Sequence, residues 1–149
     1  MYAYVDQPVE RLCMGGRFLL WAMRAWSRAI ASGTCPPIAL SSGFAAVGAL
    51  AALPDFHLAM ALFNKDSLER ISVAPMPYIR IMEDEAVLIG MWRDLAVGDV
   101  DHMRTTLGLI VEEETVPMVV RAMTAVVAKL LAAGFDLSGL ARETLKEEK

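Results

Sequence analysis

The sequence has few cysteines and no excess of basic residues. Its two cysteines, Cys13 and Cys35, fit reduced thiols in a reducing cytoplasm better than a disulfide scaffold. Lys and Arg number 14 against 18 Asp and Glu, a net charge of −4, so the clustered basic surface of a nucleic-acid-binding protein is not expected. The first residues carry no basic stretch followed by an apolar one, so no signal peptide is predicted. We expect a soluble cytoplasmic protein without a nucleic-acid partner.

The longest stretch without Asp, Glu, Lys, Arg or His covers 26 residues, from Ala29 to Pro54. A membrane-spanning helix needs about 20 mainly apolar residues. Pro36 and Pro37 cannot lie inside such a helix, which leaves Ile38 to Leu53. Much of this remainder is Ala, Gly and Ser, which contribute little transfer free energy. We therefore expect a core helix around which the chain packs, with membrane association through Ile38–Leu53 as a weaker alternative.

The chain is rich in apolar residues, and most of them recur at spacings of three and four. Hydrophobic residues make up 56% of the sequence, more than in an average soluble domain. Their spacing predicts one all-α domain over residues 1–149, a bundle of about six helices. The longer helices are expected over about 8–32, 38–53, 83–97, 100–110 and 116–133, with short ones after Pro54 and over 137–147.

One segment, residues 71–82, does not have a helical pattern. Pro75 and Pro77 exclude a continuous helix, and β-branched residues alternate with polar ones on either side of them. A hairpin or a pair of extended segments is predicted. Such a segment in a helical protein is our first candidate for a dimer contact or a ligand cover.

The stretch from Ile71 to Asp99 resembles a segment of small helical bacterial proteins that have no assigned function. Its successive features are the proline-containing segment, the acidic run Glu83-Asp84-Glu85, then Leu88-Ile89, Trp92-Arg93-Asp94-Leu95-Ala96 and Gly98-Asp99. The resemblance covers about a fifth of the chain, and its motifs mark structure rather than chemistry. It implies a cytoplasmic bacterial protein and no particular activity.

Three arginines and a tryptophan share one face of the first predicted helix: Arg17, Trp21, Arg24 and Arg28. Arginine and tryptophan can bind an anion or a flat aromatic ligand by charge and stacking. Alternatively, the arginines form ion pairs with acidic residues elsewhere, either Glu83–Glu85 or Glu112–Glu114. Spacing alone does not decide between these interpretations.

Residues for catalysis or metal binding are sparse. The two histidines, His57 and His102, lack the Glu-x-x-His pattern of di-metal helical bundles. Asp99 and His102 have a spacing of three, which an N-cap Asp followed by a first-turn residue explains without a metal. Neither cysteine has the surrounding signature of a nucleophile. We expect no catalytic residue, no metal and no cofactor, which favours a non-enzymatic protein.

Two functions remain open. The apolar excess favours an interaction or structural protein that forms a homodimer, with Trp21, Trp26, Met76 and Tyr78 as interface residues. The alternative is a regulatory protein that binds a small apolar or anionic ligand in a Met- and aromatic-lined pocket between helices. Its ligand-binding residues would be Arg17, Trp21, Arg24 and Arg28.

Overall fold

The protein is an all-α bundle, as its sequence predicts. The computed structural model describes residues 5–137, and these form six α-helices, three short 3-10 helices and no β-strand. The helix predicted over 137–147 lies outside the described residues apart from Leu137. The α-helices are α1 (Met14–Ser32), α2 (Pro36–Ala46), α3 (Leu53–Asp66), α4 (Glu83–Ala96), α5 (Val100–Gly108) and α6 (Val116–Ala132). The 3-10 helices are η2 (Val9–Arg11), η3 (Leu50–Ala52) and η4 (Glu113–Thr115).

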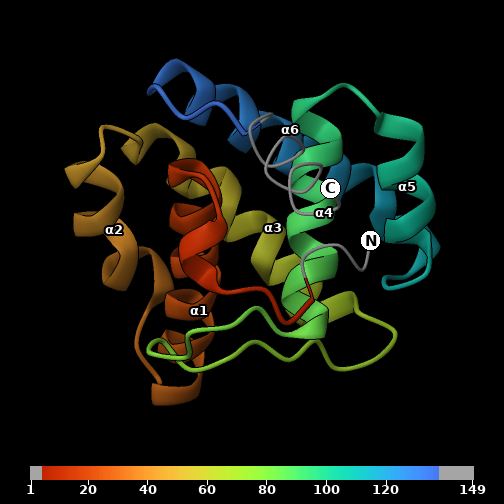
Figure 1. Ribbon diagram of the computed structural model, residues 1–149. Helices are drawn as coiled ribbons and strands as arrows, with labels where there is room; N and C mark the ends of the chain where they lie inside the picture. The colour runs from red at the N-terminus through yellow and green to blue at the C-terminus, as the bar shows by residue number, and fades with distance from the viewer. Residues whose placement is uncertain (1–4, 138–149) are drawn as a thin grey trace.

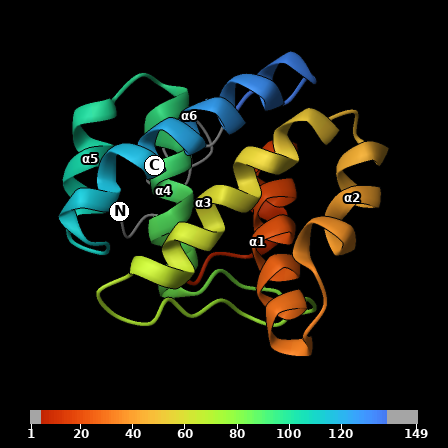
Figure 2. The ribbon, with the colours of Figure 1, turned by 180° about the vertical axis from the view of Figure 1, so that it is seen from behind.

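The core lies where α1, α3, α4 and α6 meet. The most extensive contact joins α3 to α6, while α1 packs on α2 and α4 on α5. Figures 1 and 2 show α2 and α5 on opposite outer sides, with α3 and α4 between them. Phe56 of α3 stacks on Trp92 of α4, with ring centroids 6.2 Å apart, and both side chains are buried. Burial of these large rings is a main source of stability.

The first helix begins later than predicted. Residues Val9–Arg11 form only a 3-10 turn, and Cys13 is extended, with φ −64° and ψ 170°. The Cys13 Sγ accepts a hydrogen bond from the Gly16 N–H at 3.4 Å and so caps α1. The predicted continuous helix from residue 8 is therefore wrong. The Cys13 side chain bonds the Gly16 N–H, so this amide needs no backbone carbonyl from a preceding helical turn. Gly33, at φ +75°, ends α1 as predicted.

The prediction of a central helix over Ile38–Leu53 is also wrong. The segment divides into α2, a bend at Gly48 (φ +75°), η3 and the first residue of α3. Helix α2 lies at the edge of the bundle, and Ile38 is 73% exposed. An uncharged sequence of small residues has no strongly apolar face, so absence of charge does not indicate burial. Seven of the 14 residues of α4 are buried, against three of the 11 residues of α2.

Within the described residues, one helical stretch is long and apolar enough to cross a membrane, namely Glu113–Ala132. Core helices of soluble proteins share this property. The inner face of α6, which carries Val119, Met123, Val126 and Leu130, is buried in the bundle.

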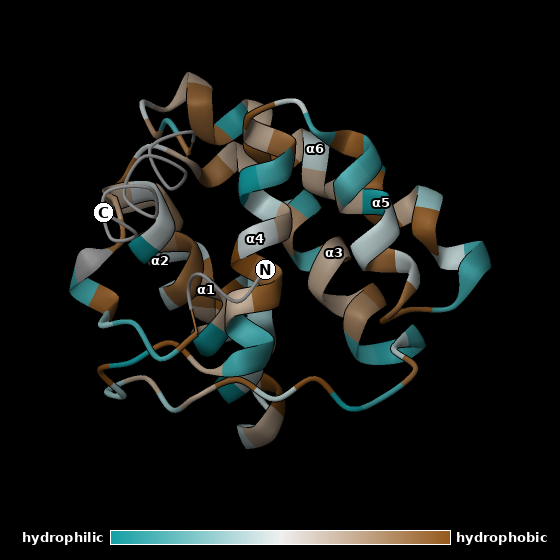
Figure 3. Ribbon diagram, turned by 45° about the vertical axis from the view of Figure 1, so that its right-hand side comes forward, coloured by the Kyte–Doolittle hydropathy of each residue, from teal (hydrophilic) through white to brown (hydrophobic). Residues whose placement is uncertain are grey.

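The strap, defined as residues 67–82, joins α3 to α4. It runs beneath the helices to the lower end of α1 and returns, and apolar and polar residues alternate along it (Figures 1 and 3). The predicted extended segment is confirmed. Its two legs do not pair with each other as a hairpin. The returning leg pairs with the segment before α1 instead, through Val9 N–H to Ile79 O and Ile81 N–H to Gln7 O.

Candidate ligand-binding groove

A groove of about 1050 Å³ lies between the C-terminal halves of α1 and α3 and the strap. Figure 2 shows these three elements from behind, with the strap below α3 and crossing the lower part of α1. The volume is at the upper end of that of sites for small organic ligands. The apolar residues that line it are Trp26, Ile30, Ala31, Met60, Phe63, Ile71, Val73, Ala74, Met76 and Leu88, together with Pro75 and Pro77.

All charged residues that line the groove are arginines. Arg24 and Arg28 come from α1 and Arg70 from the strap, and no acidic residue is among the lining residues. Arg28 and Arg70 are exposed and make no side-chain hydrogen bond or ion pair with any residue between 5 and 137. Arg28 and Arg70 thus give the lining two unpaired positive charges in a chain of net charge −4, while the nearby Asp84 carboxylate is bonded to the Ser72 N–H.

Arg24 is the one arginine of the groove that is already neutralised. Its Nε lies 2.7 Å from Glu85 Oε2 and its Nη2 lies 2.9 Å from Glu85 Oε1, and both side chains are buried. The guanidinium also donates to the carbonyl oxygens of Tyr78 at 2.7 Å and Arg80 at 2.8 Å. A buried charge is tolerated when it is paired and hydrogen-bonded in this way.

Glu85 fixes the strap from the other side. Its Oε2 accepts from the Ala74 N–H at 3.0 Å, and its Oε1 accepts from the Met82 N–H at 2.9 Å. Nearby, the Asp84 carboxylate accepts from the Ser72 N–H at 2.7 Å. Both legs of the strap are thus bound to α4 and, through Arg24, to α1. The wall that the strap gives to the groove is held in place without a ligand.

The predicted arginine face divides between two places. Arg24 and Arg28 line the groove, whereas Arg17 is about 16 Å from Arg28 along the helix axis, given a rise of about 1.5 Å per residue. Arg17 instead donates to the carbonyl oxygens of Leu12 and Glu10. The sequence leaves open whether the arginine face is a ligand site or a set of ion pairs, and for Arg24 the structure contains the ion pair with the acidic run 83–85.

Trp21 lies on the α2 side of α1, away from the groove. It is half-buried, with its ring centroid 5.7 Å from that of Phe18 and 6.5 Å from that of Phe44. Its ring also approaches the backbone of Gly43 closely. Trp21 therefore packs α1 against α2.

Trp26, predicted at an interface, forms part of the groove wall instead. It is 3% exposed, and its Nε1–H donates to His57 Nδ1 at 3.0 Å. Met76 is half-buried and also lines the groove. Of the four predicted interface residues, Tyr78 is the one that is largely exposed, at 44%, beside Ile79 at 72%.

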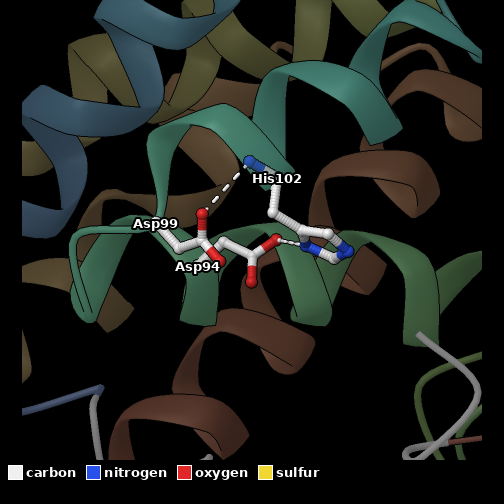
Figure 4. A group of neighbouring side chains, drawn as sticks. All are labelled: Asp94, Asp99 and His102. Atoms are coloured by element: carbon white, nitrogen blue, oxygen red, sulfur yellow. Dashed lines mark hydrogen bonds and ion pairs between the residues drawn. The ribbon is translucent and has the colours of Figure 1, made fainter.

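A second cluster joins Asp94, Asp99 and His102 at the turn between α4 and α5 (Figure 4). It is the one group among the described residues with three metal-ligand atoms within 4.8 Å of one another. His102 Nδ1 lies 2.6 Å from Asp94 Oδ2, and the Asp99 Oδ1 accepts from the His102 N–H at 3.2 Å. The latter is the N-cap that the sequence predicts.

The hydrogen bonds within this cluster give each of its three residues a structural role. Asp94 is buried and also accepts from Arg93 Nη2 at 3.0 Å, so both of its oxygens have partners. A cation here would have to displace His102 or stand beside the Arg93 guanidinium. The cluster holds the α4–α5 turn, and the groove remains the better candidate for function.

The sequence did not indicate Arg70, Met60 or Phe63 as site residues. Arg70 ends a polar stretch and has no helical partner, while Met60 and Phe63 have the spacing of ordinary core positions. No local signal distinguishes them, because tertiary packing alone brings them to Arg28.

No protein-family model, curated protein or solved structure matches this chain. Its function is therefore argued from the geometry of the groove.

Proposed function

We propose that the protein binds a small molecule whose apolar part lies in the groove between α1, α3 and the strap. The observation that carries this proposal is the groove itself, about 1050 Å³ in volume, with a wall of apolar and aromatic side chains. Three serines line it, Ser27, Ser67 and Ser72, but no histidine, cysteine, lysine or carboxylate is among the lining residues, so the lining offers no general base that could activate a serine. Binding without chemistry fits these residues best.

The fixed strap supports the proposal. A site that is already ordered loses little conformational entropy on binding, so more of the contact free energy appears as affinity. The Arg24–Glu85 pair and the backbone hydrogen bonds at Ala74 and Met82 provide this order.

Titration with the neutral apolar dye Nile red tests the proposal. We expect saturable binding of one dye per chain. Ala31 lines the groove and is exposed in the last turn of α1, so Ala31→Trp fills the groove and weakens binding at least about tenfold. Ala132→Trp is the matched control, because Ala132 is also exposed in the last turn of its helix, α6. Absence of saturable binding, or equal binding by both variants, would contradict the proposal.

A second candidate function is homodimerisation through the strap. The specific observation is that Ile79, at 72% exposure, and Tyr78 lie together on a segment whose backbone is fixed. Contiguous exposed apolar residues mark interaction sites, and tyrosine is enriched in protein interfaces, so the adjacent pair Tyr78 and Ile79 supports this candidate. Light scattering during size-exclusion chromatography would then give twice 16.3 kDa for the protein and 16.3 kDa for Ile79→Glu. A wild-type monomer at high concentration would eliminate this candidate.

A further inference from the structure

The charges of the groove point to a narrower class of ligand. We propose that the groove binds an amphipathic organic anion, with its apolar body against α1 and α3 and a carboxylate or phosphate head between Arg28 and Arg70. This inference rests on the proposed function, because it assumes that the groove is a small-molecule site.

The first argument is charge complementarity. Three arginines and no acidic residue line the groove, although acidic residues outnumber basic ones in the chain. Glu85 neutralises Arg24. Arg28 and Arg70 stay unpaired within residues 5–137 and come from two different walls, α1 and the strap. Two free guanidinium groups beside an apolar surface are complementary to an anion joined to an apolar body.

The second argument is the position of these charges. A guanidinium donates two parallel N–H bonds, which match the oxygens of a carboxylate or a phosphate. Because Arg28 and Arg70 are exposed, the head of the ligand would stay at the solvent edge of the groove. Only the apolar body leaves water, so binding avoids the cost of burying a charge.

The third argument concerns the wall that the apolar body would contact. Trp26, Met60 and Phe63 form its closed base, with exposures of 3%, 5% and 3%, and the Trp26 N–H is bonded to His57. Ile30 of α1, at 44% exposure, and the half-buried Met76 of the strap leave apolar atoms accessible beside this base. Methionine side chains are flexible, so this wall can accommodate either an alkyl chain or a ring.

Isothermal titration with three ligands of equal chain length tests the inference: decanoate and decyl phosphate below their micellar concentrations, and decanol below its solubility limit. We expect the anions to bind at least about tenfold more tightly than the alcohol, as charge-assisted hydrogen bonds suggest. Higher ionic strength should weaken binding of the anions and leave that of the alcohol unchanged. A preference between decanoate and decyl phosphate would identify the head group.

Substitutions locate the head. Arg28→Gln and Arg70→Gln should each reduce the advantage of the anions over decanol about fivefold or more, while decanol binding stays the same. Arg121→Gln is the control, because Arg121 is exposed on α6 and does not line the groove. Equal binding of all three ligands would overturn the anion inference and leave the proposed function standing. Binding of none would contradict both. An anion preference insensitive to Arg28 and Arg70 would overturn the proposed head position.

Discussion

Arg24 of α1 and Glu85 of α4 are 61 positions apart in the sequence and form a two-point ion pair in the interior. Between them they bond to the backbone at Ala74, Tyr78, Arg80 and Met82, on both legs of the strap. The pair therefore does more than join two helices. It sets the path of the segment that forms one wall of the groove, so stability and binding depend on the same contact.

Removing one partner of this pair should be costly. Glu85→Ala leaves the Arg24 charge buried without its counter-ion, and we expect a loss of about 3–5 kcal/mol in the free energy of unfolding. Urea denaturation measures it. Lys129→Ala is the control, because its ion pair with Asp55 is at the surface, where the Lys129 side chain is 45% exposed, and should cost about 1 kcal/mol or less. Equal losses in the two variants would show that the buried pair does not stabilise the fold as argued.

Alanine usually stabilises a helix relative to glycine, but the contact between Gly43 and Trp21 predicts that Gly43→Ala destabilises the protein. A Cβ on Gly43 would lie 2.2 Å from the Trp21 ring, so Gly43→Ala must shift the ring and should destabilise by about 1–3 kcal/mol. Gly90, inside α4, has nothing within 4 Å of the same position. Gly90→Ala should therefore stabilise by about 0.5–1 kcal/mol through helix propensity. Thermal denaturation of both variants checks this, and a rise in Tm for Gly43→Ala would refute the close packing.

The α4–α5 turn should depend more on Asp94 than on Asp99. Asp94 is buried and both of its oxygens have partners, Arg93 and His102, so Asp94→Ala should cost about 2–3 kcal/mol. Asp99 caps α5 with one exposed hydrogen bond, and Asp99→Ala should cost about 1 kcal/mol. Chemical denaturation of the two variants gives the comparison. If Asp99→Ala were the more damaging change, the cap rather than the buried carboxylate would hold the turn.

The sequence predicts those parts of the fold that have local signals. The Gly98-Asp99 boundary and Pro117 place α4, α5 and α6 to within one or two residues of their predicted ranges. The uncharged stretch 29–54 lacks such signals, because small residues tolerate solvent and interior alike. Its division into α2, η3 and α3 is set by packing against α1 and α6.

The candidate site is predictable only where one helix supplies it. Arg24 and Arg28 are four residues apart on α1, and their common face is visible in the sequence. Glu85 was one of several acidic residues that could pair with an arginine of this face, and no local pattern selects it. Arg70 reaches the same groove from the strap, through a path that depends on the Arg24–Glu85 pair.

Trp26 gives a direct measure of whether a ligand occupies the groove. Of the three tryptophans, it is the one that lines the groove, while Trp21 faces α2 and Trp92 lies in the core. Decanoate should therefore change the tryptophan emission of the wild-type protein and of Trp21→Phe, with the same dissociation constant in both. Trp26→Phe should lose this change and still bind decanoate in a calorimetric titration, because the phenyl ring keeps most of the apolar wall. A ligand-dependent change in emission that persists in Trp26→Phe would place the bound molecule elsewhere on the protein.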